Sequence, residues 1–230
     1  MADFPFDAVL FDCDGVLVDS EPITNRILTE MLGELGWSLS VAETMRIFVG
    51  KAVKDEAALI EARTGFAITT DWLMQFRARR NAALDVELEA IAGAETAVRA
   101  LYKTLEGRIA VASGADRIKV ELQLTKANML DCFAGRIFSG HETPRSKPYP
   151  DVYLAAAAGL GIDPARCAVV EDTVTGATAG VAAGATVFGY CPKELGHSSA
   201  AALLAAGAVQ VFQDMASLPA LLAAWRGKQG

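Results

Sequence analysis

The chain has 230 residues, of which 52% are hydrophobic, so it is long enough for one large domain or for a core domain with a smaller insert. That apolar fraction excludes a disordered chain. The formal net charge of −7 argues against nucleic acid or an anionic membrane surface as a partner.

The four cysteines form no Cys-x-x-Cys pair, which favours reduced, structural thiols. The N-terminus has neither a basic region nor a long apolar region of the kind that signal peptides carry, and no apolar stretch approaches the length of a membrane span. We therefore expect a cytoplasmic protein, a monomer or a weak homodimer.

The first structural signal is an uninterrupted apolar run at residues 8–11, which predicts a strand buried on both faces. Asp12 and Asp14 follow it, and Gly15 then allows a sharp turn. Two carboxylates held together in a partly dry site are costly unless a cation or a proton compensates. Hard cations such as Mg²⁺ favour oxygen ligands, so this motif indicates a metal site.

The next segment, up to about residue 88, shows helical periodicity and no convincing strand. We expect helices over residues 23–35, 41–48, 54–64 and 71–84. Linkers near residues 16–20 and 86–93 would join this segment to the rest. The pattern predicts a helical cap domain at residues 20–88, inserted into a core domain made of residues 1–19 and 89–230.

From residue 94 onward, strands alternate with helices. The expected strands are 108–112, 136–138, 167–170, 186–190 and 209–212, and the expected helices are 95–105, 119–128, 150–159, 176–183 and 218–225. Such alternation is typical of an α/β fold with a doubly wound, mostly parallel, Rossmann-like sheet, here carrying an inserted all-helical cap.

Polar residues follow the predicted strands. Ser113 and Asp172 each come directly after an apolar run, as Asp12 does, and Lys147 lies in the loop after another strand. Because ligands of such sheets bind beyond the carboxyl ends of the strands, we expect these side chains to meet at one rim. The two histidines, His141 and His197, have no partner spacing and are expected to be non-catalytic.

Four segments resemble, in order, the four motifs of the haloacid dehalogenase superfamily in its phosphatase and phosphomutase branch. They are DCDGV at residues 12–16, VASG at 111–114, SKPYPD at 146–151 and VVEDT at 169–173. The resemblance implies that Asp12 is a nucleophile forming an aspartyl-phosphate, and that Asp14 is a general acid and base whose carbonyl also binds Mg²⁺.

The same resemblance implies roles for the other rim residues. Ser113, Gly114 and Lys147 would hold the phosphoryl group, Asp172 would bind the metal, and Glu171 would either contribute to the metal site or only adjoin it. Phosphoryl transfer needs mainly positioning and charge neutralisation, which these residue types supply.

The expected function is Mg²⁺-dependent hydrolysis of a phosphomonoester of a small metabolite. Shorter segments resemble bacterial sugar-phosphate phosphatases, 6-phosphogluconate phosphatases among them, which implies a sugar or sugar-acid phosphate as substrate. Specificity would come from the cap, where Lys51 and Arg46 are the expected substrate contacts because a substrate carboxylate needs an opposing cation.

Two alternatives remain open. A β-phosphoglucomutase-type phosphomutase has a similar core and cap, although Thr24 stands where that mutase has a histidine. A non-catalytic protein that binds phosphorylated metabolites on the same fold belongs to another class, and the intact set of Asp12, Asp14, Lys147 and Asp172 argues against it.

Overall fold

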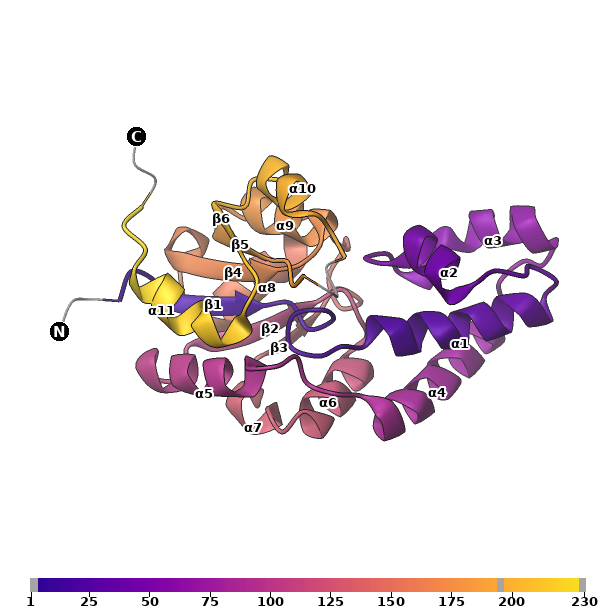
Figure 1. Cartoon of the computed structure of the whole chain (residues 1–230), viewed down its shortest axis with the longest axis horizontal. Helices are drawn as coiled ribbons and strands as arrows, with labels where there is room; N and C mark the ends of the chain where they lie inside the picture. Colours follow the sequence, from indigo (N-terminus) through magenta and orange to yellow (C-terminus); the bar gives the residue numbers. More distant parts are fainter. Residues whose placement is uncertain (1–3, 194–196, 228–230) are drawn as a thin grey trace.

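The computed structural model describes residues 4–193 and 197–227, and its centre is one parallel sheet (Figure 1). The six strands lie in the order β3-β2-β1-β4-β5-β6 and all pair in parallel. Their bounds are β1 Ala8–Phe11, β2 Ile109–Ser113, β3 Ile137–Ser139, β4 Cys167–Glu171, β5 Thr186–Tyr190 and β6 Gln210–Phe212. All six strands that the sequence predicts are present.

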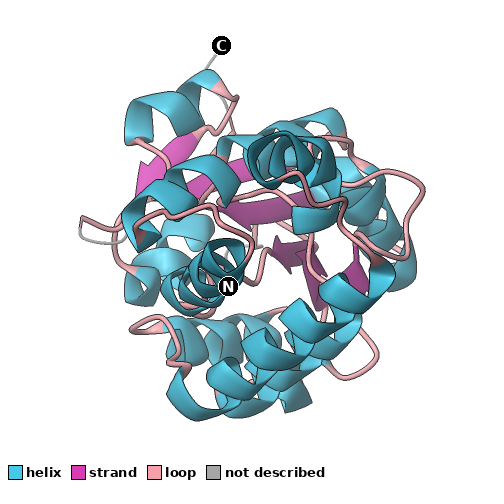
Figure 2. Ribbon diagram, turned by 90° about the vertical axis from the view of Figure 1, so that its right-hand side faces the viewer, coloured by secondary structure: helices cyan, strands magenta, loops and turns pink. Residues whose placement is uncertain are grey.

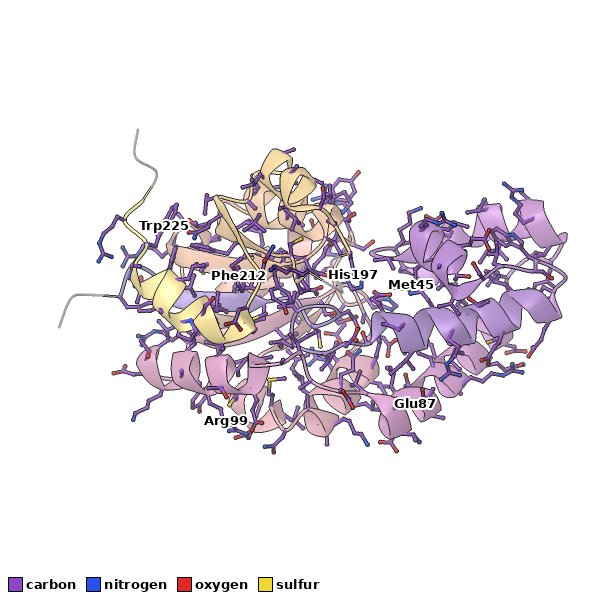
Figure 3. The ribbon with its side chains drawn as sticks, viewed as in Figure 1. Met45, Glu87, Arg99, His197, Phe212 and Trp225 are labelled. Carbon is purple, nitrogen blue, oxygen red and sulfur yellow. The ribbon has the colours of Figure 1, made fainter. Side chains whose placement is uncertain are left out.

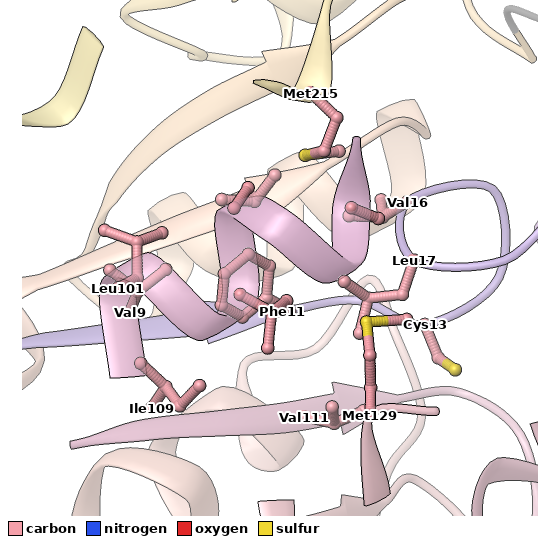
Figure 4. Packing of buried hydrophobic residues seen from close by; sticks show 14 of the residues in the cluster. Val9, Phe11, Cys13, Val16, Leu17, Leu101, Ile109, Val111, Met129 and Met215 are labelled. Atoms are coloured by element: carbon pink, nitrogen blue, oxygen red, sulfur yellow. The ribbon is translucent and has the colours of Figure 1, made fainter. Parts of the chain in front are cut away.

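The two faces of the sheet bury alternate residues of each strand. In β1, Val9 and Phe11 pack into one apolar cluster, whereas Ala8 and Leu10 pack into another on the opposite face. Side chains in a strand point alternately to the two faces, so a strand covered by helices on both sides must be apolar throughout. Figure 4 shows the first cluster, in which Val9 and Phe11 meet Leu101.

Helices cover both faces of the sheet, and strands and helices alternate along the chain (Figure 2). Helices α5 (Ala94–Thr104), α6 (Arg117–Lys126), α7 (Leu130–Phe133) and α11 (Leu218–Ala223) contribute to the cluster of Val9 and Phe11. Helices α8 (Asp151–Leu160), α9 (Val174–Ala182) and α10 (Ala200–Ala205) contribute to that of Ala8 and Leu10. This is the doubly wound arrangement that alternating strands and helices predict.

The helical insert lies to one side of the sheet, beyond the strand ends that point toward it (Figure 1). It comprises α1 (Glu21–Glu34), α2 (Val41–Phe48), the 3₁₀ turn η1 (Val53–Glu56), α3 (Ala57–Thr64) and α4 (Thr70–Glu87). These helices enclose an apolar cluster of their own, which includes Leu28, Ile60 and Phe76. The insert therefore has a core separate from those of the sheet.

The differences from the predicted elements are local. Helices α7 and α10 are absent from the prediction. Helix α7 has only four residues, too few to show helical periodicity, and α10 reads AAALLA, which has no polar side to mark a helix face. Helix α6 begins two residues before the predicted start of 119, since the side chain of Asp116 caps it by accepting a hydrogen bond from the backbone N–H of Lys119. Within the described residues, no helix has the length and hydrophobicity that crossing a membrane would need.

Candidate active site

The sheet brings the predicted rim residues to one end. Asp12 directly follows β1, Ser113 is the last residue of β2, Glu171 is the last residue of β4 and Asp172 follows it. Lys147 reaches the same place from the loop between β3 and α8. The central strand β1 lies between β2 and β4, so the strand order reverses direction at β1. The carboxyl ends of the strands at such a switch point are the usual ligand position in this architecture.

Lys147 is the centre of a buried network at this rim. Its Nζ donates hydrogen bonds to Asp12 Oδ1 at 2.9 Å, to Glu171 Oε1 at 2.6 Å and to the hydroxyl of Tyr153 at 3.1 Å. Burial opposes its charge, but Asp12 and Glu171 raise the pKa of Lys147 above its usual value. The ammonium is thus fixed beside the carboxylate of Asp12. Gly176 allows this packing, since a Cβ there would collide with the carboxylate of Glu171.

Three carboxylates converge on one point. Asp12, Glu171 and Asp172 each offer an oxygen, and these atoms all lie within 4.8 Å of one another. The Oδ1 of Asp172 is buried without a hydrogen-bond partner among the described residues. Burial raises the pKa of Asp12 well above its usual range, against the opposing effect of Lys147, and raises that of Asp172 to about 6.

This acidic cluster suits a hard cation. Its donors are carboxylate oxygens, the type that Mg²⁺ prefers, and one of its residues, Asp172, carries a buried oxygen without a hydrogen-bond partner among the described residues. Gly15, at φ +74°, passes close to Asp172, and a Cβ at this position would collide with that carboxylate. The residues present therefore fit a divalent metal ion.

His197 is a neighbour of this cluster that no motif in the sequence indicates. Its Nδ1 lies 2.5 Å from Oδ2 of Asp172, and in Figure 3 the residue lies between the sheet and the helical insert. Burial disfavours the charged imidazole, but the hydrogen bond to Asp172 raises the pKa of His197 to about 9. The structure thus pairs a cation with Asp172. His197 comes from the segment after β5, outside every recognised motif, so no spacing could have identified it.

Asp14 has a very different environment from Asp12. Its Oδ1 accepts hydrogen bonds from Lys119 Nζ and Gln123 Nε2, both at 2.7 Å, and from the hydroxyl of Ser20. Burial would raise its pKa, but Lys119 and these hydrogen bonds lower the pKa of Asp14 to about 2. Asp14 is therefore an ionised carboxylate with one oxygen fully engaged.

Sequence reasoning missed Lys119 and Gln123, although a signal was present. The two residues are one helical turn apart on α6, and both are buried on the same side as Val120 and Leu124. A lysine and a glutamine on the buried side of an amphipathic helix are unusual, because long polar side chains are rarely buried without a partner. Here the partner is Asp14.

Ser113 is fully buried at the end of β2. Its Oγ accepts a hydrogen bond from the backbone N–H of Ala115 at 3.1 Å, and its carbonyl accepts one from Gly140 at 2.8 Å. The hydroxyl hydrogen has no acceptor among the described residues, so it is available to a ligand. Ser113 and Gly114 both line the cavity described next.

A cavity of about 390 Å³ lies between the rim and the helical insert. Asp12, Asp14 and Lys147 line its core side, and helices α1 and α4 and the segment around η1 line the other. The volume is within the range usual for small-molecule sites. Of the two cap residues expected to contact substrate, Lys51 lines the cavity, and its Nζ forms an ion pair with Oε1 of Glu56 at 3.4 Å. Arg46 is exposed and does not line the cavity.

A buried ion pair connects the insert to the core beside this cavity. Arg80 of α4 donates a hydrogen bond to Asp116 at 2.9 Å, and the two side chains are only 7% and 17% exposed. Arg80 interrupts a buried stripe on α4 that otherwise consists of Trp72, Phe76 and Leu84. An arginine in an apolar stripe is a signal that this helix face meets an acidic group, and it too was overlooked in the sequence.

Comparison with known proteins agrees with this geometry. The family model described as haloacid dehalogenase-like hydrolase matches residues 6–184. The 6-phosphogluconate phosphatase of Escherichia coli K12 is 34% identical over 80% of this chain and 82% of its own, and hexitol phosphatase B of the same organism is 32% identical over 76% and 79%. A HAD family hydrolase from Deinococcus radiodurans R1, solved with bound phosphate and sodium, superposes with a TM-score of 0.75 at 39% identity and covers 96% of both chains.

Proposed function

Because the chain belongs to the haloacid dehalogenase-like hydrolases and is a phosphatase of that family, we propose that it hydrolyses the phosphomonoester of a sugar or sugar acid with the help of Mg²⁺. The observation that carries this proposal is the pair of carboxylates after β1. Asp12 is held by Lys147 beside an acidic cluster, and Asp14 is held by Lys119 and Gln123. The two carboxyls therefore have environments suited to different roles.

In the proposed reaction, a carboxylate oxygen of Asp12 attacks phosphorus and the ester oxygen leaves, which gives an aspartyl-phosphate. The ammonium of Lys147, 2.9 Å from Asp12, would neutralise charge on the phosphoryl oxygens, and the free hydroxyl hydrogen of Ser113 would bind one of them. Water then attacks the aspartyl-phosphate and regenerates Asp12.

Asp14 would move the protons. Its ionised form can take a proton from the attacking water in the second step. Its protonated form is needed to donate to the leaving oxygen in the first step, and Lys119 disfavours that form in the unliganded site. The dependence of the reaction on the leaving group, described in the Discussion, tests this role directly.

The metal would be held by Asp12, Asp172 and the carbonyl of Asp14, with Glu171 beside them. When bound, Mg²⁺ would supply positive charge against the phosphoryl oxygens. Three converging carboxylates and the orphaned Oδ1 of Asp172 support this assignment. Glu171 already accepts hydrogen bonds from Lys147 and Tyr153, so its first role is to orient Lys147.

The substrate class rests on the relatives and on the cavity. The two relatives are named for a phosphorylated sugar acid and for hexitol phosphates, and the cavity suits a small metabolite rather than a polymer. The helical insert, residues 20–88, would act as a cap that selects the substrate. Of the two contacts expected from the sequence, Lys51 lines the cavity and is proposed here, whereas Arg46 does not line it. A cytoplasmic location and a monomeric or weakly dimeric state stay predictions.

The test is phosphate release from a panel of phosphorylated metabolites and from p-nitrophenyl phosphate. We expect release with Mg²⁺, and loss of release to the detection limit in Asp12→Asn and in excess chelator, because each removes charge from the reacting centre. Restoration by added Mg²⁺ is the control for the chelator. Full turnover in Asp12→Asn would refute the role of Asp12, and binding without release from any ester would favour the non-catalytic alternative.

A further inference from the structure

We propose that Arg77 and Lys54 form a subsite that binds a carboxylate at the end of the substrate remote from its phosphate. This inference rests on the proposed phosphatase function and adds a substrate class to it, a phosphate ester that carries a second anionic group. It also differs from what the sequence alone suggested, since neither residue is among the expected substrate contacts.

The first argument is the direction of the side chains on α4. Leu73, Phe76, Arg77 and Arg80 line the cavity, and their spacing of three, four and seven residues places them on one helix face. Arg79 lies off this face and instead donates a hydrogen bond to Glu34 of α1 at 2.5 Å. Of the three neighbouring arginines, two therefore face the cavity and one does not.

The second argument is charge pairing within the cavity. Six lysines and arginines line it, and four of them have an acidic partner: Lys147 with Asp12, Lys119 with Asp14, Arg80 with Asp116 and Lys51 with Glu56. Arg77 and Lys54 also line it, but neither forms a hydrogen bond or an ion pair with any residue in the ranges 4–193 and 197–227. Among the described residues, these are the cations of the cavity that can pair with an anionic group of a ligand.

Besides burial, Lys54 and Arg77 both lower the pKa of one neighbour, His141. His141, which lines the cavity and is half-buried, has its pKa lowered by burial first and then by Lys54, Arg77 and Arg80, with Asp116 opposing. Arg80 forms an ion pair with Asp116, whose pKa Arg77 also lowers from a longer range, whereas neither Arg77 nor Lys54 forms an ion pair of its own among the described residues. A neutral histidine here can donate one further hydrogen bond to an anion.

The chemistry favours a carboxylate. A guanidinium presents paired N–H groups that match the two oxygens of a carboxylate, and Lys54 would add a second charge. The two relatives are named for substrates that differ at the end remote from the phosphate. 6-Phosphogluconate ends there in a carboxylate, whereas a hexitol phosphate such as glucitol 6-phosphate ends in a hydroxymethyl group. The subsite predicts that this chain prefers the acid.

The experiment compares kcat/KM for gluconate 6-phosphate and glucitol 6-phosphate, which have the same chain length and the same hydroxyl groups at C2 to C5 and differ at C1. We expect wild-type protein to prefer the acid and Arg77→Ala to lose roughly 10- to 100-fold of that preference, the usual effect of one charged hydrogen bond. Arg77→Lys should retain part of the preference. Arg79→Ala is the matched control on the same helix and should leave the ratio unchanged.

An unaltered ratio in Arg77→Ala would overturn the inference, and a loss of preference in Lys51→Ala alone would return the role to Lys51. Calorimetric binding of the two ligands to Asp12→Asn, with and without Arg77→Ala, tests the subsite without turnover. Absence of phosphate release would refute the phosphatase proposal, whereas equal affinities of Asp12→Asn for acid and alcohol would refute the subsite.

Discussion

The two sides of the cavity differ in how their charges are satisfied. On the core side, Lys147 and Lys119 are buried and paired with the two carboxylates after β1. On the insert side, Arg77 and Lys54 face the same cavity without an acidic partner among the described residues. A preorganised, internally paired rim suits chemistry common to all phosphate esters, whereas unpaired cations suit recognition of one substrate class.

Substitutions on the core side should therefore slow all substrates, and substitutions on the insert side should change their ranking.

The largest effect concerns Asp14. Asp14→Asn should reduce kcat by roughly 10²- to 10⁴-fold, the usual range for one acid–base group. The backbone carbonyl remains, so metal affinity should largely survive. The loss of kcat/KM, which reports formation of the aspartyl-phosphate, should be smallest for p-nitrophenyl phosphate, whose leaving group needs no proton. Equal losses of kcat/KM for nitrophenyl and alkyl esters, measured by steady-state kinetics, would contradict the acid role.

A smaller core-side effect is expected for Lys119. Lys119→Met removes the ammonium 2.7 Å from Asp14 but keeps the length of the side chain. The carboxylate of Asp14 loses one of its three hydrogen-bond donors and with it part of its orientation, so kcat/KM should fall about 10- to 100-fold for acidic, neutral and aryl phosphates alike. Lys103→Met, on the exposed surface of α5, serves as the control. A change confined to acidic substrates would instead place Lys119 with the cations that select substrate.

The contact between insert and core should be visible in stability. Arg80→Met leaves Asp116 without its partner in a mostly buried position, and we expect the free energy of unfolding to fall by about 1–3 kcal/mol. Arg79→Met breaks a pair whose side chains are 44% and 55% exposed and should change little. Urea unfolding of both variants measures the difference, and equal losses would show that the buried pair has no special weight.

The smallest effect is a pH dependence of that contact. Burial raises the pKa of Asp116, but the nearby charge and hydrogen bond of Arg80 lower it by more, so the pKa in the folded protein lies below its usual value. Because the pKa of Asp116 is lower in the folded protein, its ionised form stabilises the fold at pH values above the unfolded-state pKa of about 3.9. This stabilisation is lost as the pH falls through the folded-state pKa. Asp116→Asn, which retains a helix-capping side chain, should be less stable than wild type at pH 7. Urea unfolding between pH 7 and about 3.5 should show the two converging, and a constant gap would contradict the assignment.

The sequence predicted the fold and the rim because both depend on local patterns. Apolar runs ending in Asp12, Ser113 and Glu171 predict parallel strands, and parallel strands bring their carboxyl ends together. The four short motifs at these ends could therefore be interpreted without knowing any distance.

The partners of the rim residues could not be found in this way. Lys119 and Gln123 lie more than one hundred residues from Asp14 along the chain, and Arg80 meets Asp116 only because the insert docks on the core. Lys51 was expected to contact the substrate because a substrate carboxylate needs an opposing cation, whereas Arg77 was not among the expected contacts. Long-range packing decides which charges are already paired, and this information is not contained in residue type or spacing.

The central claim is that Asp12 is the residue that becomes phosphorylated. The most direct test is acid quenching of Asp14→Asn during turnover of p-nitrophenyl phosphate labelled in its phosphoryl group, followed by peptide mapping, because this leaving group needs no proton and only the hydrolysis step is slowed. Slowed release of phosphate from the enzyme should let label accumulate on the peptide that contains Asp12, and Asp12→Asn in the same background should carry none. Normal turnover with no label on that peptide, or label on another residue, would contradict the account.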